Sequence, residues 1–180
     1  MEDLSLHILD IVENSVAAQA GKIEIRITED KKKDLISVEV IDNGIGMDKE
    51  TVKKVLDPFY TSKTVRRFGL GLPLLSEAAK AANGRFSIKS KIKEGTKIKA
   101  DFQYSHIDRQ PLGDIGQTII TLVMGNPEID LIYVHKRNNH KYSLDTRKIK
   151  AKLKEAPINS LAGIRMIRED LKKDTGSPYF

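Results

Sequence analysis

Hydrophobic residues follow two different periods along the chain. In the first twenty residues they recur every three or four positions, which predicts a helix over residues 4–20 that stops at Gly21. Strict alternation of apolar and polar residues then predicts four half-buried strands, at residues 22–28, 36–41, 86–91 and 97–102. Charged residues 29–34 and the turn at residues 93–96 join these strands into two antiparallel hairpins.

Helix signals lie between the two hairpins. Asp48 can cap a short helix, which Asp57-Pro58 ends. A longer helix is predicted over residues 72–83, with Pro73 tolerated in its first turn and Gly84 as its stop. This part of the chain therefore predicts an α+β fold, a two-layer α/β sandwich in which a mixed, mostly antiparallel sheet carries helices on one face.

The remainder of the chain predicts a small α/β C-terminal extension. Residues 105–111 are predicted to form a linker between a domain at residues 1–104 and the extension at residues 112–180. The β-branched run at residues 118–123 would suit a strand as well as a helix, and we favour the helix. The expected order is helix, two strands and two helices, at residues 114–124, 129–136, 141–144, 145–155 and from Asn159 or Ser160 to 173.

Composition narrows the class of protein. The 180 residues are 39% hydrophobic and 31% charged, which suits a globular chain with a sizeable core. There is no run of about 18 apolar residues, no Cys, and no basic start of the kind that opens a signal peptide. These features predict a cytoplasmic protein without a membrane span. The net charge of +6 comes largely from lysines spread over many elements, so we do not expect nucleic acid as a partner.

The turn from Asp42 to Asp48 is the first candidate for chemistry. It follows a strand directly and contains Gly44 and Gly46, which let a ligand approach the backbone closely. A carboxylate at the strand end can accept a hydrogen bond from a flat donor such as an exocyclic amine. The same residues also form ordinary turns, so this segment alone does not identify a site.

Residues 59–72 form the second candidate. Hydroxyls and cations, among them Thr61, Ser62 and Lys63, precede the sequence Gly69-Leu70-Gly71-Leu72 at the start of a predicted helix. Free backbone N–H groups and the helix dipole favour an anion at such a point, and the cations can add charge-assisted contacts to phosphate. An ordinary surface loop with a glycine-rich exit is the alternative.

A polar stripe on the first helix is the third candidate. His7, Asp10 and Asn14 lie three and four positions apart, away from the apolar arc. Such a stripe is either the solvated face of a helix or a partly buried polar site.

Four segments in chain order resemble the N, G1, F, G2 and G3 boxes of the GHKL ATPase superfamily, the histidine kinase-like ATPase domain or Bergerat fold. This superfamily includes gyrase B, MutL, histidine kinases, anti-sigma-factor serine kinases and the heat-shock chaperones of the ninety-kilodalton class. The resemblance covers about residues 4–104. The segments are Asp10–Asn14, Asp42–Met47, Phe59–Lys63 with Gly69–Leu72, and Gly95-Thr96.

The resemblance implies ATP and Mg²⁺ as cofactors and assigns roles to single residues. Asn14 matches the asparagine that coordinates Mg²⁺, a hard cation that suits an amide oxygen. Asp42 matches the aspartate that receives the adenine amino group, and Thr96 matches the threonine that supports it. Residues 57–68 correspond to the ATP lid. The implied ATP-binding residues are Asn14, Asp42, Gly44, Gly46, Met47, Thr61, Ser62, Lys63, Gly69, Leu70, Gly71, Leu72 and Thr96.

The chain departs from the family pattern at its catalytic carboxylate. Asp10 stands four residues before Asn14, where the family usually has a glutamate, and Glu13 is the alternative. Ala17 replaces a residue that is often basic in histidine kinases. Nothing before the first helix resembles a histidine-containing dimerisation helix pair. We expect the remaining histidines to be surface or packing residues rather than phosphoacceptors: His106, His135 and His140.

These features lead to three hypotheses for function. The first is a stand-alone protein kinase that transfers the γ-phosphoryl group of ATP to a partner protein, with Asp10 as the base. The second is an ATPase switch, in which ATP closes the lid and promotes formation of a homodimer or release of a partner. The third is a nucleotide sensor without turnover.

Overall fold

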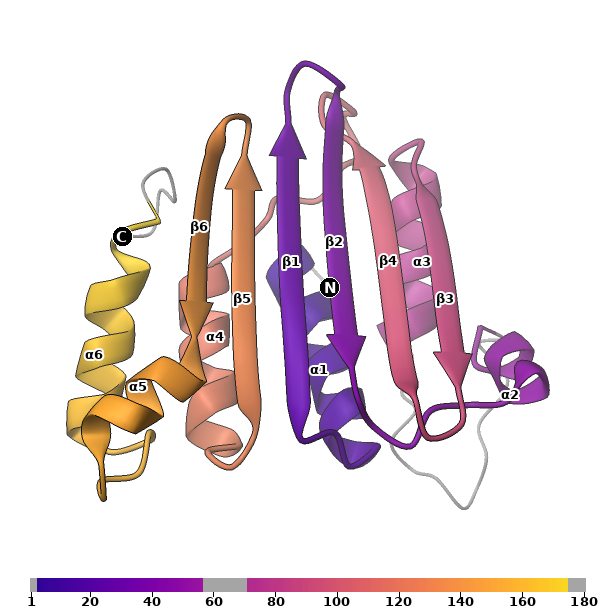
Figure 1. Ribbon diagram of the computed structural model, residues 1–180. Helices are drawn as coiled ribbons and strands as arrows, with labels where there is room; N and C mark the ends of the chain where they lie inside the picture. Colours follow the sequence, from indigo (N-terminus) through magenta and orange to yellow (C-terminus); the bar gives the residue numbers. More distant parts are fainter. Residues whose placement is uncertain (1–2, 57–70, 175–180) are drawn as a thin grey trace.

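The computed structural model describes residues 3–56 and 71–174. A mixed six-stranded sheet lies at its centre, in the order β3-β4-β2-β1-β5-β6 (Figure 1). Neighbouring strands pair antiparallel except β1 and β5, which are parallel. The strands are β1 (Lys22–Asp30), β2 (Leu35–Asp42), β3 (Arg85–Lys91), β4 (Gly95–Gln103), β5 (Asp130–Arg137) and β6 (His140–Asp145).

Helices cover one face of this sheet. In Figure 1, α1, α3 and α4 all lie behind the strands, while α2 lies beside β3. α5 and α6 pack against each other, and α6 also packs against α4. The α+β prediction is therefore confirmed. The helices are α1 (Leu4–Ala17), α2 (Lys49–Lys54), α3 (Gly71–Ala81), α4 (Ile115–Gly125), α5 (Thr146–Leu153) and α6 (Leu161–Leu171).

The alternation of residue types decides which face of the sheet is covered. Ile23, Ile25 and Ile27 of β1 are fully buried, whereas Lys22 before them and Arg26 among them are exposed. Successive side chains of a strand point to opposite faces, so the isoleucines face the helices and the charged residues face solvent. The predicted half-buried strands are thus confirmed.

Polar caps begin the helices where the sequence places them. The side chains of Asp48, Asp114 and Asp145 each accept a hydrogen bond from a backbone N–H group in the first turn of α2, α4 and α5. Ser160, rather than Asn159, caps α6 in the same way. Such caps satisfy N–H groups that have no partner within the helix. The β-branched run at residues 118–123 forms part of α4 and not a strand.

The predicted stops of two helices are wrong. α1 ends at Ala17, and Gln19 rather than Gly21 takes the left-handed conformation (φ 60°). α3 ends at Ala81, and Asn83 rather than Gly84 is left-handed (φ 53°). Gly84 is required for another reason, because a Cβ atom there would lie 1.8 Å from a backbone oxygen of β4.

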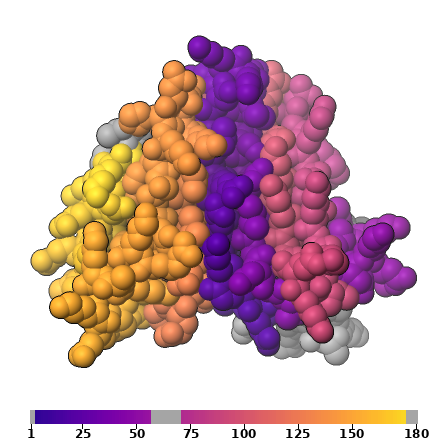
Figure 2. All heavy atoms as spheres, viewed as in Figure 1, coloured from indigo at the N-terminus to yellow at the C-terminus, as the bar shows by residue number. Residues whose placement is uncertain are grey.

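The two strands of the C-terminal extension join the same sheet as the first four. Ile25 of β1 pairs with Tyr133 of β5, and the orange C-terminal side lies directly against the indigo β1 in Figure 2. The predicted division of the chain at residues 105–111 remains a prediction. Within the described ranges no helix is long and apolar enough to cross a bilayer.

Candidate functional site

An open pocket lies between α1, the turn after β2, β4 and the start of α3. Most of its wall is apolar, and a few polar side chains converge on it, which is the usual composition of a small-molecule site. The structure thereby brings together several residues that the sequence predicts for ATP binding. The lining residues are Ile11, Asn14, Ser15, Ala18, Asp42, Ile45, Gly46, Met47, Leu72, Thr96 and Ile98.

Asp42 is the buried carboxylate of this pocket, with 7% of its surface exposed. Its Oδ1 atom accepts hydrogen bonds from the backbone N–H groups of Gly44 (2.9 Å) and Thr96 (3.2 Å). Its Oδ2 atom accepts one from the hydroxyl of Ser15 (2.8 Å). An ionised carboxylate has about four acceptor positions. One position on Oδ2 therefore remains for a donor on a ligand.

Two serines that the sequence reasoning missed hold this site in place. The hydroxyl oxygen of Ser15 lies 2.8 Å from Oδ2 of Asp42 and 3.2 Å from the carbonyl oxygen of Ile11, so the shorter hydrogen bond of its single proton is the one to Asp42. The hydroxyl of Ser90 accepts from Met47 N (2.8 Å) and lies 2.8 Å from Thr96 Oγ1. The sequence offers one signal for Ser15, which is that it directly follows Asn14, the predicted Mg²⁺ ligand. Ser90 lies on β3, and only strand pairing brings it to the pocket.

The glycines of the turn after β2 are fixed by contacts within the protein. Gly46 has φ +67°, and a Cβ atom there would lie 2.0 Å from the carbonyl oxygen of Lys91. A Cβ atom on Gly44 would lie 2.6 Å from the carbonyl oxygen of Ala18. Close packing against β3 and α1 thus explains both glycines without a ligand. Their predicted approach to a base remains a prediction.

Asn14 lines the pocket from α1 and is partly exposed. Its side-chain amide makes no hydrogen bond to another described residue, so its oxygen is available to a cation. Among residues 3–56 and 71–174, no group of three or more His, Asp and Glu side chains could hold a metal. One amide oxygen fits Mg²⁺, which commonly takes one or two protein ligands and completes its shell with water and phosphate.

Asp10 lies one turn before Asn14 and against the first residue of α3. A Cβ atom on Gly71 would lie 3.1 Å from Oδ2 of Asp10. The carboxylate is therefore next to the helix start that the sequence predicts for phosphate binding. Glu13, the alternative base, is exposed and does not line the pocket.

His7, the third member of the polar stripe, has a different environment. It is 2% exposed, and its Nε2 atom lies 2.9 Å from Oε1 of Gln110 in the segment before α4. Burial lowers the pKa of His7 below 6.5, although the hydrogen bond to Gln110 opposes this effect. The stripe therefore combines a buried histidine with Asp10, which lies beside Gly71, and with Asn14, which lines the pocket.

Several predicted binding residues lie outside the described part of the chain. They belong to the expected ATP lid and to the glycine-rich segment before α3. Their predicted roles are neither supported nor contradicted by the geometry. These residues are Thr61, Ser62, Lys63, Gly69 and Leu70.

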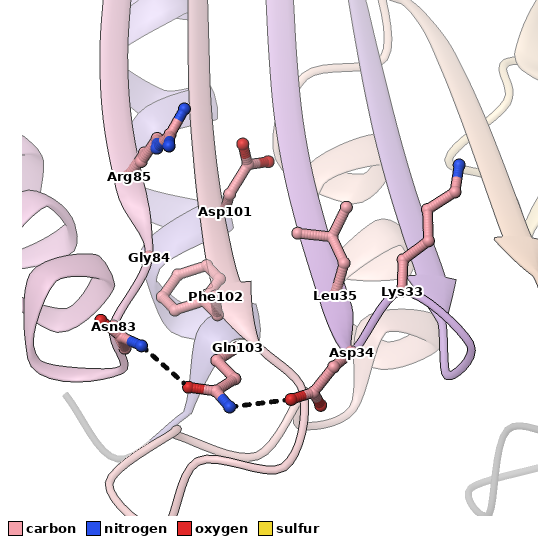
Figure 3. Close-up of a pocket in the computed structure, with 9 residues that line it drawn as sticks. All are labelled: Lys33, Asp34, Leu35, Asn83, Gly84, Arg85, Asp101, Phe102 and Gln103. Atoms are coloured by element: carbon pink, nitrogen blue, oxygen red, sulfur yellow. Dashed lines mark hydrogen bonds between the residues drawn. The ribbon is translucent and has the colours of Figure 1, made fainter.

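A larger hollow lies at the other ends of β2 and β4 (Figure 3). Much of its polar surface is already paired within the protein. Nε2 of Gln103 donates to Asp34 (2.8 Å), and Nδ2 of Asn83 donates to Oε1 of Gln103 (3.0 Å). None of the residues predicted to bind ATP lines it. The smaller pocket at Asp42 is therefore the better candidate for the nucleotide site, because it contains the predicted ATP-binding residues and the larger hollow does not.

Comparison with known proteins gives a match to one family. The sequence model of the protein family described as "Histidine kinase-, DNA gyrase B-, and HSP90-like ATPase" matches residues 2–106. The sensor histidine kinase YxdK of Bacillus subtilis (strain 168) is 34% identical over 106 residues, which are 55% of this chain and 32% of that protein. The chain thus spans about a third of the length of this relative.

Solved structures share the fold at low sequence identity. The MutL ATPase domain of Aquifex aeolicus, complexed with ADP, is 18% identical with a TM-score of 0.54, covering 83% of this chain and 68% of that one. The N-terminal domain of a DNA repair protein is 17% identical with a TM-score of 0.58, covering 95% of this chain and 57% of that one. The family match supports ATP binding by this chain, and the solved structures support its fold.

Proposed function

The chain belongs to the histidine kinase-, DNA gyrase B- and HSP90-like ATPase family, and from this premise we propose that it is a protein kinase that uses ATP and Mg²⁺. The main support for ATP binding is the buried Asp42 carboxylate, which keeps one acceptor position facing a largely apolar pocket. The exocyclic amine of adenine is a donor that fits this position. The apolar walls suit the faces of the base.

The opposite side of the pocket suits the phosphates. α3 begins at Gly71, where free N–H groups and the helix dipole favour negative charge. Asn14 would hold Mg²⁺, which neutralises charge on the phosphates when it is bound. Thr61, Ser62, Lys63, Gly69 and Leu70 keep their proposed phosphate-binding roles.

Asp10 is the proposed base. It would take the proton of a Ser or Thr hydroxyl on a partner protein while the hydroxyl oxygen bonds to the γ-phosphorus. The bond from that phosphorus to the bridging oxygen breaks, and ADP leaves. Its place beside Gly71 supports this role, since α3 begins where the phosphates are expected. The partner and the cytoplasmic location are likewise proposals.

Turnover with γ-labelled ATP tests the reaction. We expect the purified chain to release little phosphate alone and to label a protein in an extract of its own cells. Asp10→Asn should reduce labelling by about a hundredfold or more, the usual contribution of a positioned base. Asp10→Glu, which restores the longer carboxylate of the family, should retain activity and serves as the matched control.

Other outcomes would change the proposal. Steady phosphate release by the chain alone, abolished in Asp10→Asn, would favour the ATPase switch. Tight ATP binding with neither release nor labelling would leave a nucleotide sensor. Labelling that survives in Asp10→Asn would remove Asp10 from the reaction.

Metal dependence tests the role of Asn14. Replacing it with Ala removes the amide oxygen that we assign to Mg²⁺. We expect ATP affinity measured with Mg²⁺ to fall about tenfold or more, a loss typical of a hydrogen bond or ligand to a charged group, while affinity in EDTA changes little. Equal losses under both conditions would mean that Asn14 does not act through the metal.

A further inference from the structure

A buried cluster of ionisable side chains joins β1, β5 and the end of α6. Glu29, His135 and Asp174 are 7%, 3% and 8% exposed. The cluster lies far from the nucleotide pocket, because Asp42 pairs with Ile23 at one end of β1 and Glu29 lies at the other end. The proposed function uses none of these residues. Burying several charged groups is unfavourable unless they form ion pairs and hydrogen bonds with one another, and these residues do so.

His135 lies between two carboxylates. Its Nε2 atom is 2.9 Å from Oε1 of Glu29, and its Nδ1 atom is 2.7 Å from Oδ2 of Asp174. Ionised carboxylates only accept hydrogen bonds, and a neutral imidazole can donate only one. The two short contacts therefore require one additional proton. The imidazolium form of His135 satisfies both of them.

The charges of the cluster balance only when that proton is present. Nε of Arg137 donates to Oε1 of Glu29 (2.9 Å), and Nη2 of Arg137 forms an ion pair with the same oxygen (2.8 Å), so two cations face two carboxylates. Loss of the proton would leave one uncompensated negative charge and a nitrogen lone pair facing a carboxylate oxygen. Burial lowers the pKa of His135, but the hydrogen bonds to Asp174 and Glu29 outweigh it and raise the pKa above 6.5.

Two tyrosines lie beside the cluster. Burial raises the pKa values of Tyr133 and Tyr142, so both phenols stay protonated. Tyr142 donates to Asp170 of α6 (3.2 Å), which also pairs with Lys173. α4, which packs against α6, carries no ionisable side chain. His135 is therefore the group in this cluster whose protonation changes above pH 6.5.

The two carboxylates do not depend equally on His135. Glu29 keeps the hydrogen bond and the ion pair with Arg137 when the imidazolium is lost. Asp174 keeps only the longer bond from the hydroxyl of Tyr133 (3.3 Å). Asp174 directly follows the last turn of α6, whose buried Ile167 and Leu171 hold the helix on the core. Deprotonation should thus loosen the end of α6 rather than the whole helix.

We propose that His135 is a proton-operated latch that fastens the C-terminal end of α6 to the sheet. The sign follows from linkage. A group with a raised pKa in the folded protein stabilises it fully below the unfolded pKa, near 6.5, and this contribution is lost as the pH rises through the folded pKa. The latch is closed at low pH and opens above the pKa of His135.

Two measurements on the intact chain test the latch. Nitrogen NMR of the imidazole should show both ring nitrogens of His135 protonated at pH 6.5. Hydrogen exchange, corrected for its intrinsic pH dependence, should show that amides at residues 171–174 lose protection as His135 titrates. Each unit by which the pKa exceeds 6.5 corresponds to a protonated latch about tenfold stronger than the neutral one. The strands β1 and β5 should keep their protection.

Asp174→Asn gives the decisive variant, because it retains the shape of the side chain and removes its charge. We expect fast exchange at residues 171–174 at every pH and a lower pKa for His135. His140→Gln is the matched control, since His140 is an exposed histidine on β6, and it should leave the pH dependence of α6 intact.

Specific results would overturn the proposal. A single protonated nitrogen on His135 at pH 6.5 would remove the proton on which the latch depends. Protection at residues 171–174 that does not change while His135 titrates would show that the proton does not control α6. If the Asp174→Asn protein retained the wild-type pH profile of exchange, the same conclusion would follow: the proton on His135 does not control α6.

Discussion

At the scale of single residues, Asp42 shows how a side chain can be held by the protein and still serve a ligand. Three hydrogen bonds, from Ser15, Gly44 and Thr96, fix its orientation. The sequence predicts Asp42 because it stands between a strand and a glycine turn. It does not predict Ser15 or Ser90 as partners, because a lone serine on a helix or strand has no distinguishing pattern. The Ser15 contact exists only after α1 packs against β2, and the Ser90 contact only after β3 pairs with β4.

Asp42→Asn tests the free acceptor position. An amide of the same shape can keep part of the internal network, but its NH₂ group would face the adenine amine as donor against donor. We expect the loss of one ligand hydrogen bond, about 1–3 kcal/mol or roughly a 5- to 150-fold weaker Kd for ATP, measured by calorimetry. Asp108→Ala, which changes an exposed carboxylate, is the control. Unchanged affinity in Asp42→Asn would remove the adenine from this position.

At the scale of elements, local sequence signals were sufficient for nearly every helix and strand. Caps such as Asp48, Asp114 and Ser160 act within one turn of their own position, so they can be recognised without tertiary structure. The helix stops were less predictable, because Gln19 and Asn83 adopt left-handed backbone next to glycines that would do so at lower cost. The glycine at 84 is instead fixed by its contact with β4.

The turn after β2 yields a prediction at this scale. Gly46→Ala would place a side chain in a left-handed conformation and within 2.0 Å of a backbone oxygen. We expect a loss of at least about 2 kcal/mol in the free energy of unfolding, measured by urea denaturation. Gly21→Ala, where a Cβ atom meets nothing within 4 Å, should change stability by less than about 0.5 kcal/mol. Similar midpoints for the two variants would contradict the packing account.

At the scale of the whole molecule, the C-terminal strands complete one continuous sheet. β5 covers the edge of β1 that the first four strands would leave open, and α4 packs against α1. Because α1 carries Asp10 and Asn14, the extension also supports the helix on which the proposed site is built. An open, flat strand edge is a hazard for a folded protein, since it can pair with other chains.

Truncation tests whether the predicted division at residues 105–111 separates independent domains. A fragment of residues 1–106 would lose the partner strand of β1 and the helix packed against α1. We expect it to unfold at a lower urea concentration than the full chain and to associate through the edge of β1, as measured by denaturation and sedimentation. A fragment that is monomeric and as stable as the full chain would support two independent domains.

The resemblance to the family indicated the order of the nucleotide-site segments, and the sequence by itself determined the elements, most of their caps and the α+β class. These properties depend on periodicity and on contacts between near neighbours in the chain. Only the tertiary structure decided that β5 lies parallel to β1, that Ser15 and Ser90 support the pocket, and that Glu29, His135 and Asp174 meet. These residues are far apart in sequence, and their meeting depends on how the whole sheet and its helices pack.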